Sequence, residues 1–385
     1  MRARRICIVL TSRGNYGKMK SLIELLEKDK TFDLRVVVGG SLLLDKYGRI
    51  LDSEHTDNIP ISYKLNFVVE GENLPTMAKS AGLALIEFSS AFQNINPDLV
   101  MVIADRFECL PIAMAAAYMN IPVAHVEGGE ISGSIDESIR HAITKLAHIH
   151  FPASGDAAQR IIRMGEPEES VFCVGSSSFD VLRHLSMNLG VINQYQETHG
   201  VGVRISLQPK KFLLVVQHPV TTEYSENYAN AEETIAAIRR IEMPTVWIWP
   251  NMDAGSDGIS KAIREFREQH NPQFVQFFKS APIELFGPLL ANAACIVGNS
   301  SSGIREAAFL GTPCVNIGTR QQGRMRGKNV IDVDHDSEQI IGAIRAQLQK
   351  TERKTEEIYG DGFAAEKIIE VLRGFDFQSQ KRNTF

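Results

Sequence analysis

Short, continuously apolar runs alternate with amphipathic segments of helical length along most of this 385-residue chain. The strands predicted in the first part of the chain are 6–10, 34–38, 99–103, 123–126, 149–151 and 171–174. The predicted helices are 18–26, 74–92, 111–118, one beginning near 135, 156–164 and one from 179 onward, with a turn at 11–14. Strands that are apolar on both faces and separated by helices are typical of a parallel sheet covered on both sides. The sequence therefore predicts an α/β, doubly wound first domain.

A second series of the same kind follows a polar stretch at 186–209, which we interpret as a linker. Its predicted strands are 212–216, 245–248, 274–278, 295–297 and 314–316, and its predicted helices are 232–241, 259–268, 282–290 and 303–310. A chain of this length exceeds a single typical core. We expect two Rossmann-like domains, 1–190 and 210–360, with a ligand cleft between their strand ends. A helix and tail at 361–385 can cross back to the first domain.

The amino-acid composition limits the kinds of molecule that this chain is expected to bind. The formal net charge is −5 and no long basic run occurs, which argues against nucleic acid and anionic membranes. The apolar run after the basic N-terminus is too short for a signal peptide or a membrane span. The 5 cysteines have no C-x-x-C spacing and are typical of buried thiols in a reducing cytoplasm. His141 and His148 have no third ligand at a known spacing, so no metal site is expected.

The predicted strand at 123–126 leads through a glycine-rich loop into an amphipathic helix that begins near Ile135. The spacing of Ser134 and Glu137 predicts a capping box at the helix start. Asp136 and Arg140 then lie one turn apart, and we expect their charges to be held together at the rim of the helix. An ordinary ion pair on a helix surface is the alternative interpretation.

Two further acids lie just before that helix. Glu127 and Glu130 bracket Gly128-Gly129 at the carboxyl end of the predicted strand, where open α/β sheets bind ligands. Taken singly, they are also compatible with solvated loop residues. The concentration of carboxylates at a strand end, two glycines and a helix start favours a functional site.

In the predicted second domain, a strand is followed by the run Asn299-Ser300-Ser301-Ser302-Gly303. Small hydroxyl residues at a strand-to-helix turn expose backbone N–H groups that suit a phosphate, whereas a plain N-cap needs only one serine. Glu306, one turn later, is placed to accept ribose hydroxyls, and Arg320 after the next strand is placed to meet the phosphates. The sequence favours a nucleotide site here.

Other polar residues follow predicted strands in both domains. His218 ends the first strand of the second domain, and Asn251 and Asp253 end the next. In the first domain, Arg13 follows strand 6–10 and Asp105-Arg106 follows strand 99–103. A histidine at such a strand end is either a packed residue or a proton carrier and cationic partner of an anion.

Several stretches are long enough to serve as specific motifs. They are ADRFE at 104–108, HVEGGEISGSIDESIRHAITKLAH at 125–148, QHPVTTE at 217–223, PNMDAGS at 250–256, GNSSSGIREAAFLGTPCVNIGTRQQGR at 298–324 and YGDG at 359–362. Together, and in this order, they resemble the hydrolysing UDP-N-acetylglucosamine 2-epimerases, which begin sialic-acid synthesis. The resemblance implies a glycosyltransferase-B type fold with the sugar nucleotide between two Rossmann-like domains.

The resemblance also implies roles for residues of this chain. The positions that match the family's catalytic residues are Asp105, Glu127, Asp136, Arg140 and His218. Those that match its nucleotide-binding residues are Arg13, Arg106, Asn251, Ser300, Ser301, Glu306 and Arg320. No metal or redox cofactor is implied, and a homo-dimer or homo-tetramer is expected.

The implied reaction begins when a carboxylate removes the C2 proton and the nucleoside diphosphate leaves C1. Water then adds to the resulting 2-acetamidoglucal and gives N-acetylmannosamine and UDP. Asp105, Glu127 and Asp136 are expected to share the proton transfers, without an assignment of the first base. Alternatives are a non-hydrolysing 2-epimerase, a retaining glycosyltransferase, a catalytically silent sugar-nucleotide sensor, or a hydrolysing enzyme that acts on a UDP-diacetamido-trideoxy sugar or a GDP-sugar for legionaminic acid.

Overall fold

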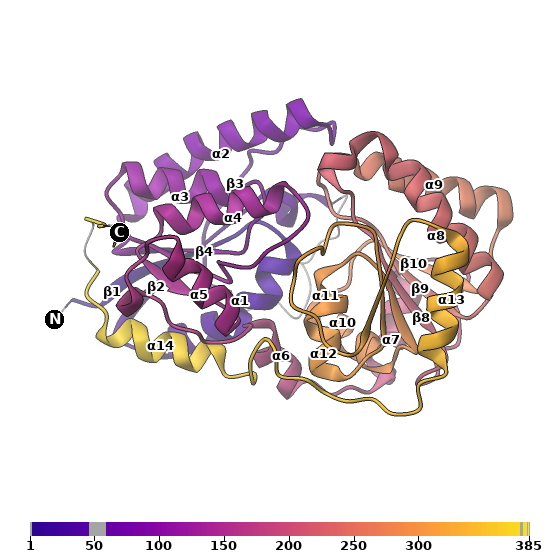
Figure 1. Cartoon of the computed structure of the whole chain (residues 1–385). Helices are drawn as coiled ribbons and strands as arrows, with labels where there is room; N and C mark the ends of the chain where they lie inside the picture. Colours follow the sequence, from indigo (N-terminus) through magenta and orange to yellow (C-terminus); the bar gives the residue numbers. More distant parts are fainter. Residues whose placement is uncertain (1, 46–58, 378–379, 383, 385) are drawn as a thin grey trace.

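The computed structural model describes residues 2–45, 59–377, 380–382 and 384. It contains two α/β domains that lie side by side, each built on a central sheet covered by helices (Figure 1). Within the described residues, no helix is both long enough and apolar enough to cross a membrane.

The sheet of the first domain has the order β3-β2-β1-β4-β5-β6 and is parallel throughout. Its strands are β1 (Arg4–Leu10), β2 (Phe32–Gly39), β3 (Ile61–Leu65), β4 (Leu99–Ile103), β5 (Val123–Val126) and β6 (Ile149–Phe151). The helices of this domain are α1 (Arg13–Lys28), α2 (Leu74–Ile95), α3 (Cys109–Tyr118), α4 (Ile135–Leu146), α5 (Gly155–Arg163) and α6 (Ser178–His184).

The apolar strands explain this layering. Ile6 and Ile8 of β1 face one buried cluster, while Cys7 and Val9 face another on the opposite side of the sheet. Each face therefore needs its own layer of helices, since apolar surface on both sides of a strand must be removed from water. The carboxyl ends of all six strands point the same way, toward the second domain.

The second sheet has the order β13-β12-β11-β8-β9-β10-β7, in which only β7 is antiparallel among the described strands. Its strands are β7 (Gly200–Gly202), β8 (Leu213–Val216), β9 (Thr245–Ile248), β10 (Val275–Phe278), β11 (Cys295–Gly298), β12 (Cys314–Ile317) and β13 (Val330–Val333). The helices are α7 (Ile192–His199), α8 (Asn227–Ile241), α9 (Ser256–His270), α10 (Ile283–Asn292), α11 (Ser301–Ile304), α12 (Glu306–Leu310) and α13 (Ser337–Leu348).

The structure corrects the interpretation of 186–209 as a linker. Helix α7 buries Ile192 in the core of the second domain, and β7 pairs with β10 at the edge of the second sheet. The buried side chain of Gln196 donates to Gln276 Oε1 at 2.7 Å. The sequence pattern missed this element because one side of an edge element faces solvent, so few of its residues are apolar.

Three other local predictions were wrong. The strand expected at 171–174 makes only an isolated bridge between Val171 and His150. The turn expected at 11–14 is shorter, because Ser12 caps α1 and Arg13 already belongs to that helix. The helix expected at 303–310 is split at Arg305 into α11 and α12.

The C-terminal helix α14 (Ala364–Gly374) lies on the first domain beside α1 (Figure 1). Its residues Ala365, Ile368 and Leu372 belong to the same buried cluster as β1. Asp180 at the start of α6 accepts the backbone N–H groups of Ala364 at 2.9 Å and of the next residue at 2.6 Å. This contact caps the helix where the chain returns to the first domain.

Candidate active site

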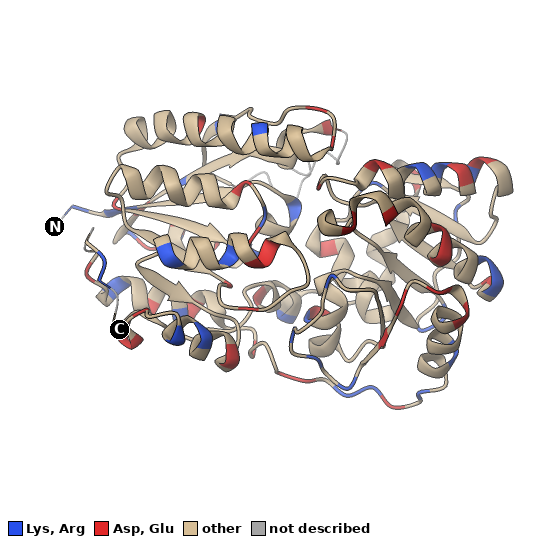
Figure 2. Ribbon diagram, turned by 45° about the horizontal axis from the view of Figure 1, so that its top comes forward, with Lys and Arg blue, Asp and Glu red and all other residues tan. Residues whose placement is uncertain are grey.

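The carboxyl ends of the two sheets face each other across the domain boundary. Charged residues lie on helices and loops of both domains, including those at the boundary, whereas most of the strand surface is uncharged (Figure 2). The boundary is bridged by Arg106 and Asp253, whose side chains lie 3.1 Å apart. The N–H of Gly133 also donates to the carbonyl of Arg320 at 3.1 Å. Residues of both domains therefore form one site.

The structure places every residue singled out for catalysis or nucleotide binding around two adjoining pockets at this boundary. The larger pocket is lined, among others, by Arg13, Asp105, Arg106, His218, Asn251, Ser300, Ser301, Glu306 and Arg320. The smaller pocket is lined, among others, by Asp105, Glu127, Asp136, Arg140, Ser301 and Arg320. Because Asp105, Ser301 and Arg320 line both, the two pockets are continuous parts of one site.

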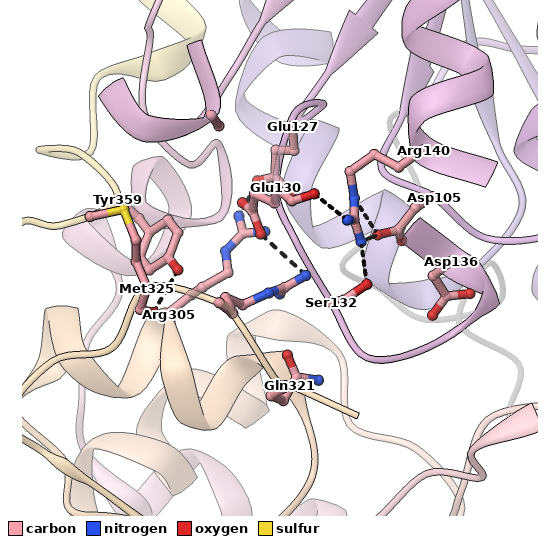
Figure 3. Close-up of polar contacts among 12 residues, drawn as sticks. Asp105, Glu127, Glu130, Ser132, Asp136, Arg140, Arg305, Gln321, Met325 and Tyr359 are labelled. Atoms are coloured by element: carbon pink, nitrogen blue, oxygen red, sulfur yellow. Dashed lines mark hydrogen bonds and ion pairs between the residues drawn. The ribbon is translucent and has the colours of Figure 1, made fainter. Parts of the chain in front are cut away.

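Arg140 does not pair with Asp136 as expected from their spacing. The Arg140 side chain is buried and turns toward the carboxylate of Asp105, to which its Nε donates at 2.9 Å (Figure 3). It also donates to the carbonyl of Glu130 and to Ser132 Oγ, at 2.5 and 3.0 Å. Burial opposes ionisation of Asp105, but the charge of Arg140, the charge of Arg324, the hydrogen bond from Arg140 and the charge of Lys18 together outweigh burial and hold the pKa of Asp105 well below its usual range.

Asp136 lies near this pair without its own close cation. Its nearest ion-pair partner, Arg320 Nη2, is 3.7 Å away, and Ser134 Oγ donates to its Oδ2 at 2.9 Å. Burial, with the negative charge of Asp105 next in importance, raises the pKa of Asp136 to about 6. The capping box is absent, since Ser134 accepts from the N–H of Asp136 and Glu137 accepts from Ser132.

Glu127 is held differently. Lys18 Nζ lies 2.5 Å from its Oε2, and Arg305 from the second domain pairs with its Oε1. Burial by itself raises the pKa of Glu127, but Arg305 and Lys18 together hold that pKa well below its usual range. Glu127 is therefore an ionised, tightly paired carboxylate in the unliganded chain.

The three acids thus have different chemical roles available to them. A general base for a weakly acidic carbon needs a carboxylate with a raised pKa, because a more basic group accepts the proton more readily. Asp136 meets this condition. Asp105 and Glu127 are bound by Arg140 and Arg305, which makes both poor bases in the unliganded chain.

His218 presents a neutral imidazole to the larger pocket. Its Nδ1 accepts the N–H of Asn251 at 3.2 Å, which leaves the proton on Nε2. Burial, and then the charges of Arg320, Arg13 and Arg106, keep the pKa of His218 well below its usual value. The cationic partner considered from the sequence is therefore corrected to a neutral N–H donor.

The remaining polar residues surround the anionic part of the site. Arg13 reaches across the boundary and donates to the carbonyls of Lys279 and Trp249, at 2.9 and 3.2 Å. Ser300 caps α11 by accepting the N–H of Ser302, and Arg320 donates to the carbonyl of Asn299. Since α11 has only 4 residues, its dipole is small, and anion binding rests mainly on hydroxyl, amide and guanidinium groups.

Sequence reasoning missed the second-domain arginines that hold the acids. Arg305 is 3% exposed, pairs with Glu127 and lies 3.3 Å from Glu130. Arg324 lies 3.2 Å from the other oxygen of Glu130. The available signal was the charged pair Arg305-Glu306 inside an otherwise apolar stretch, where a charge survives burial only with a partner.

Two α/β domains built on mainly parallel sheets, with a candidate site between their strand ends, define a glycosyltransferase-B type of fold. The structure of the Methanocaldococcus jannaschii UDP-GlcNAc 2-epimerase in complex with UDP-GlcNAc and UDP has this fold, with a TM-score of 0.78, 21% identity, and coverage of 96% of this chain and 99% of that chain. The Neisseria meningitidis UDP-GlcNAc 2-epimerase bound to UDP-GlcNAc gives a TM-score of 0.74 at 17% identity, and covers 96% of this chain and 100% of that chain.

Sequence comparison gives the family. Residues 24–373 match the model of the UDP-N-acetylglucosamine 2-epimerase family. The chain is 35% identical over 382 residues to the UDP-N,N'-diacetylbacillosamine 2-epimerase (hydrolyzing) of Legionella pneumophila, covering 99% of this chain and 98% of that protein. It is 31% identical to a UDP-N-acetylglucosamine 2-epimerase of Neisseria meningitidis serogroup B, covering 98% of both chains. The chain belongs to the UDP-N-acetylglucosamine 2-epimerase family.

Proposed function

We propose that this chain is a hydrolysing 2-epimerase that converts UDP-N-acetylglucosamine, or a close UDP-linked 2-acetamido sugar, and water into UDP and the free manno-configured sugar. The observation that carries the proposal is the contrast between Asp136, with its pKa raised to about 6, and the arginine-paired acids beside it. A poised base next to a cluster of anion-binding residues suits elimination across C1 and C2 of a sugar diphosphate.

In this mechanism, Asp136 takes the C2 proton while the C1–O bond to the diphosphate breaks, and a 2-acetamidoglucal forms. His218 Nε2–H, Arg13 and Arg320 stabilise the negative charge that develops on the leaving diphosphate. Glu306 and the hydroxyls of Ser300 and Ser301 hold the nucleotide. Addition of hydroxide from water at C1 and of a proton at C2 from the opposite face then gives the epimerised sugar.

Two substrates are worth separating, because the similar Legionella pneumophila protein is described as acting on UDP-N,N'-diacetylbacillosamine and the Neisseria meningitidis protein on UDP-N-acetylglucosamine. We expect the chain to release a free sugar from one of a panel of UDP- and GDP-linked sugars, incubated in D₂O. NMR should show deuterium at C2 of that sugar, since the C2 proton is lost to the enzyme and replaced from solvent. Retention of the original hydrogen at C2 throughout turnover would rule out elimination. Formation of a UDP-linked epimer without free sugar would indicate a non-hydrolysing enzyme.

We also propose that the chain forms a homo-oligomer through the outer face of α2 and α3. Ile86 is 63% exposed and Leu83 is 42% exposed on α2, and Tyr118 at the end of α3 is 80% exposed. Large apolar side chains exposed on two helices that contact each other favour burial against another copy. Light scattering at micromolar concentration should give a dimer or larger species, and Ile86→Asp should shift it toward the monomer. A wild-type monomer would contradict the proposal.

A further inference from the structure

A run of serines links the two halves of the site. Ser176, Ser177 and Ser178 lie at the start of α6, on the domain boundary. Ser176 Oγ lies 2.9 Å from Glu127 Oε1, and Ser178 Oγ lies 2.6 Å from Glu306 Oε1, both within hydrogen-bond distance. The two hydroxyl oxygens lie 2.9 Å from each other. An unbroken chain of short contacts therefore joins a carboxyl group of the first domain to a carboxyl group of the second.

The number of protons available along this path of three contacts is informative. The contacts from Glu127 to Ser176, from Ser176 to Ser178 and from Ser178 to Glu306 each require one proton to be a hydrogen bond. Each serine hydroxyl supplies only one. If both carboxyl groups are ionised, the two hydroxyl oxygens face each other with no proton between them, which is repulsive. One additional proton, carried by one of the carboxyl groups, makes every contact a hydrogen bond.

The charges around the two ends of this path differ. Glu127 is flanked by Lys18 of α1 and by Arg305, which also donates to Ser176 Oγ at 2.5 Å. These cations favour the ionised form of Glu127. Arg305 is shared with Glu130, whereas Glu306 contacts Ser178 through one oxygen and keeps the other buried without a hydrogen-bond partner among the described residues. Among the described residues, Glu306 thus lacks the ion pairs that Glu127 makes with Lys18 and Arg305.

The loop that carries the serines is fixed by a close approach of two glycines. A Cβ added to Gly360 would lie 2.6 Å from the Cα of Gly175, and both residues have positive φ, 105° and 93°. The N–H of Ser176 donates to the carbonyl of Tyr359 at 2.6 Å. This contact gives the YGDG motif a physical role, because it sets the position of Ser176 between Glu127 and Arg305.

We propose that Ser176 and Ser178 carry one proton between Glu306 and Glu127, and that Glu127, once protonated, acts as the general acid of the reaction. The inference rests on the proposed function. Glu306 gives its proton to Ser178, Ser178 gives its own to Ser176, and Ser176 gives its own to Glu127. Three O–H bonds break and three form, and the net result is the transfer of one proton from Glu306 to Glu127. Ribose hydroxyls that donate to Glu306 favour its ionised form and so drive the proton toward Glu127. Glu127 then returns a proton to C2, while Asp136 serves as the base on the other face.

The sequence offers a matched control. Ser177 lies between Ser176 and Ser178 in the sequence and is 1% exposed. Its hydroxyl has no hydrogen-bond partner among the described residues. Ser178→Ala and Ser177→Ala therefore remove the same atom from adjacent buried positions, but only the first breaks the path. Ser178→Thr retains the hydroxyl and serves as the rescue variant.

The dependence of kcat on pH is the first readout. With the path broken, Glu127 gains a proton only at lower pH, because Lys18 and Arg305 favour its ionised form. Ser178→Ala should lower kcat about tenfold or more and move the alkaline limb of the profile about one unit toward acid, with KM changed less than about twofold. Ser177→Ala should keep the wild-type profile, and Ser178→Thr should restore it. Identical profiles for Ser178→Ala and Ser177→Ala would overturn the proposal.

A second readout needs no turnover. Infrared difference spectra on addition of UDP should show a shift of one carboxylic-acid carbonyl band in the wild type and in Ser177→Ala, as the proton moves from Glu306 to Glu127. The shift should be absent in Ser178→Ala. No UDP-induced change in the wild type would overturn the proton path even if the enzyme is active. A clear shift in a chain that releases no sugar would instead contradict the proposed function alone.

Discussion

Asp136→Asn is expected to lower kcat by about 10²–10⁴-fold while UDP binding is retained, because the variant loses the general base but none of the nucleotide contacts. Asparagine has nearly the same shape and can still accept the hydroxyl of Ser134, so the start of α4 should be preserved. Steady-state kinetics and calorimetry with UDP measure the two effects separately. Loss of UDP affinity in parallel with kcat would mean that Asp136 is a structural residue.

The pH dependence of the wild type tests the same assignment. Asp136 must be ionised to act as a base, and its pKa is raised to about 6 by burial and by Asp105. On the acid side of the profile, activity should therefore fall as the pH decreases through about 6. Glu137→Gln is the matched control, since this neighbouring carboxylate lies 3.6 Å from His141 and belongs to neither pocket. Glu137→Gln should have the wild-type kcat and the same fall in activity toward acid pH as the wild type.

The second large effect is expected at His218. His218→Ala should lower kcat for sugar release by about 10²–10³-fold, because a preorganised donor to a developing anion contributes about 3–4 kcal/mol. The loss should concentrate in the elimination half of the reaction, where negative charge forms on the diphosphate oxygen. The imidazole is neutral, so the wild-type profile should show no limb assigned to its protonation near neutral pH.

Supplying the intermediate separates the two halves of the reaction. His218→Ala should still hydrate added 2-acetamidoglucal at close to the wild-type rate, since its carboxylates are unchanged. Asp105→Asn and Glu127→Gln should be impaired in that half-reaction, because they disturb the partners of Arg140 and Arg305. Equal losses in both halves for His218→Ala would place the histidine in general positioning rather than in expulsion of the diphosphate.

The strands of this protein were predictable because their signal is local. Runs such as 99–103 and 213–216 are apolar at every position, and only a strand buried on both faces requires that pattern. Where an element is half-exposed, as in β7, β13 and α7, the pattern weakens and the sequence alone missed it. The break between α11 and α12 at Arg305 was missed because it accompanies a contact with Glu127, far away in sequence.

For the site residues too, the sequence determined one part of the answer and the tertiary structure the other. Strand ends, glycines and motif positions identified Asp105, Glu127 and Asp136 as one group of acids, because the carboxyl ends of parallel strands must share an edge. Only the tertiary structure decided how they differ. Arg140 pairs with Asp105 and not with its helical neighbour Asp136, and Arg305 pairs with Glu127 across the domain boundary. Asp136 is therefore the acid of the three whose pKa is raised. Residue order sets which groups are near one edge, whereas protonation depends on distances of a few ångströms between residues far apart in the chain, and folding alone sets those distances.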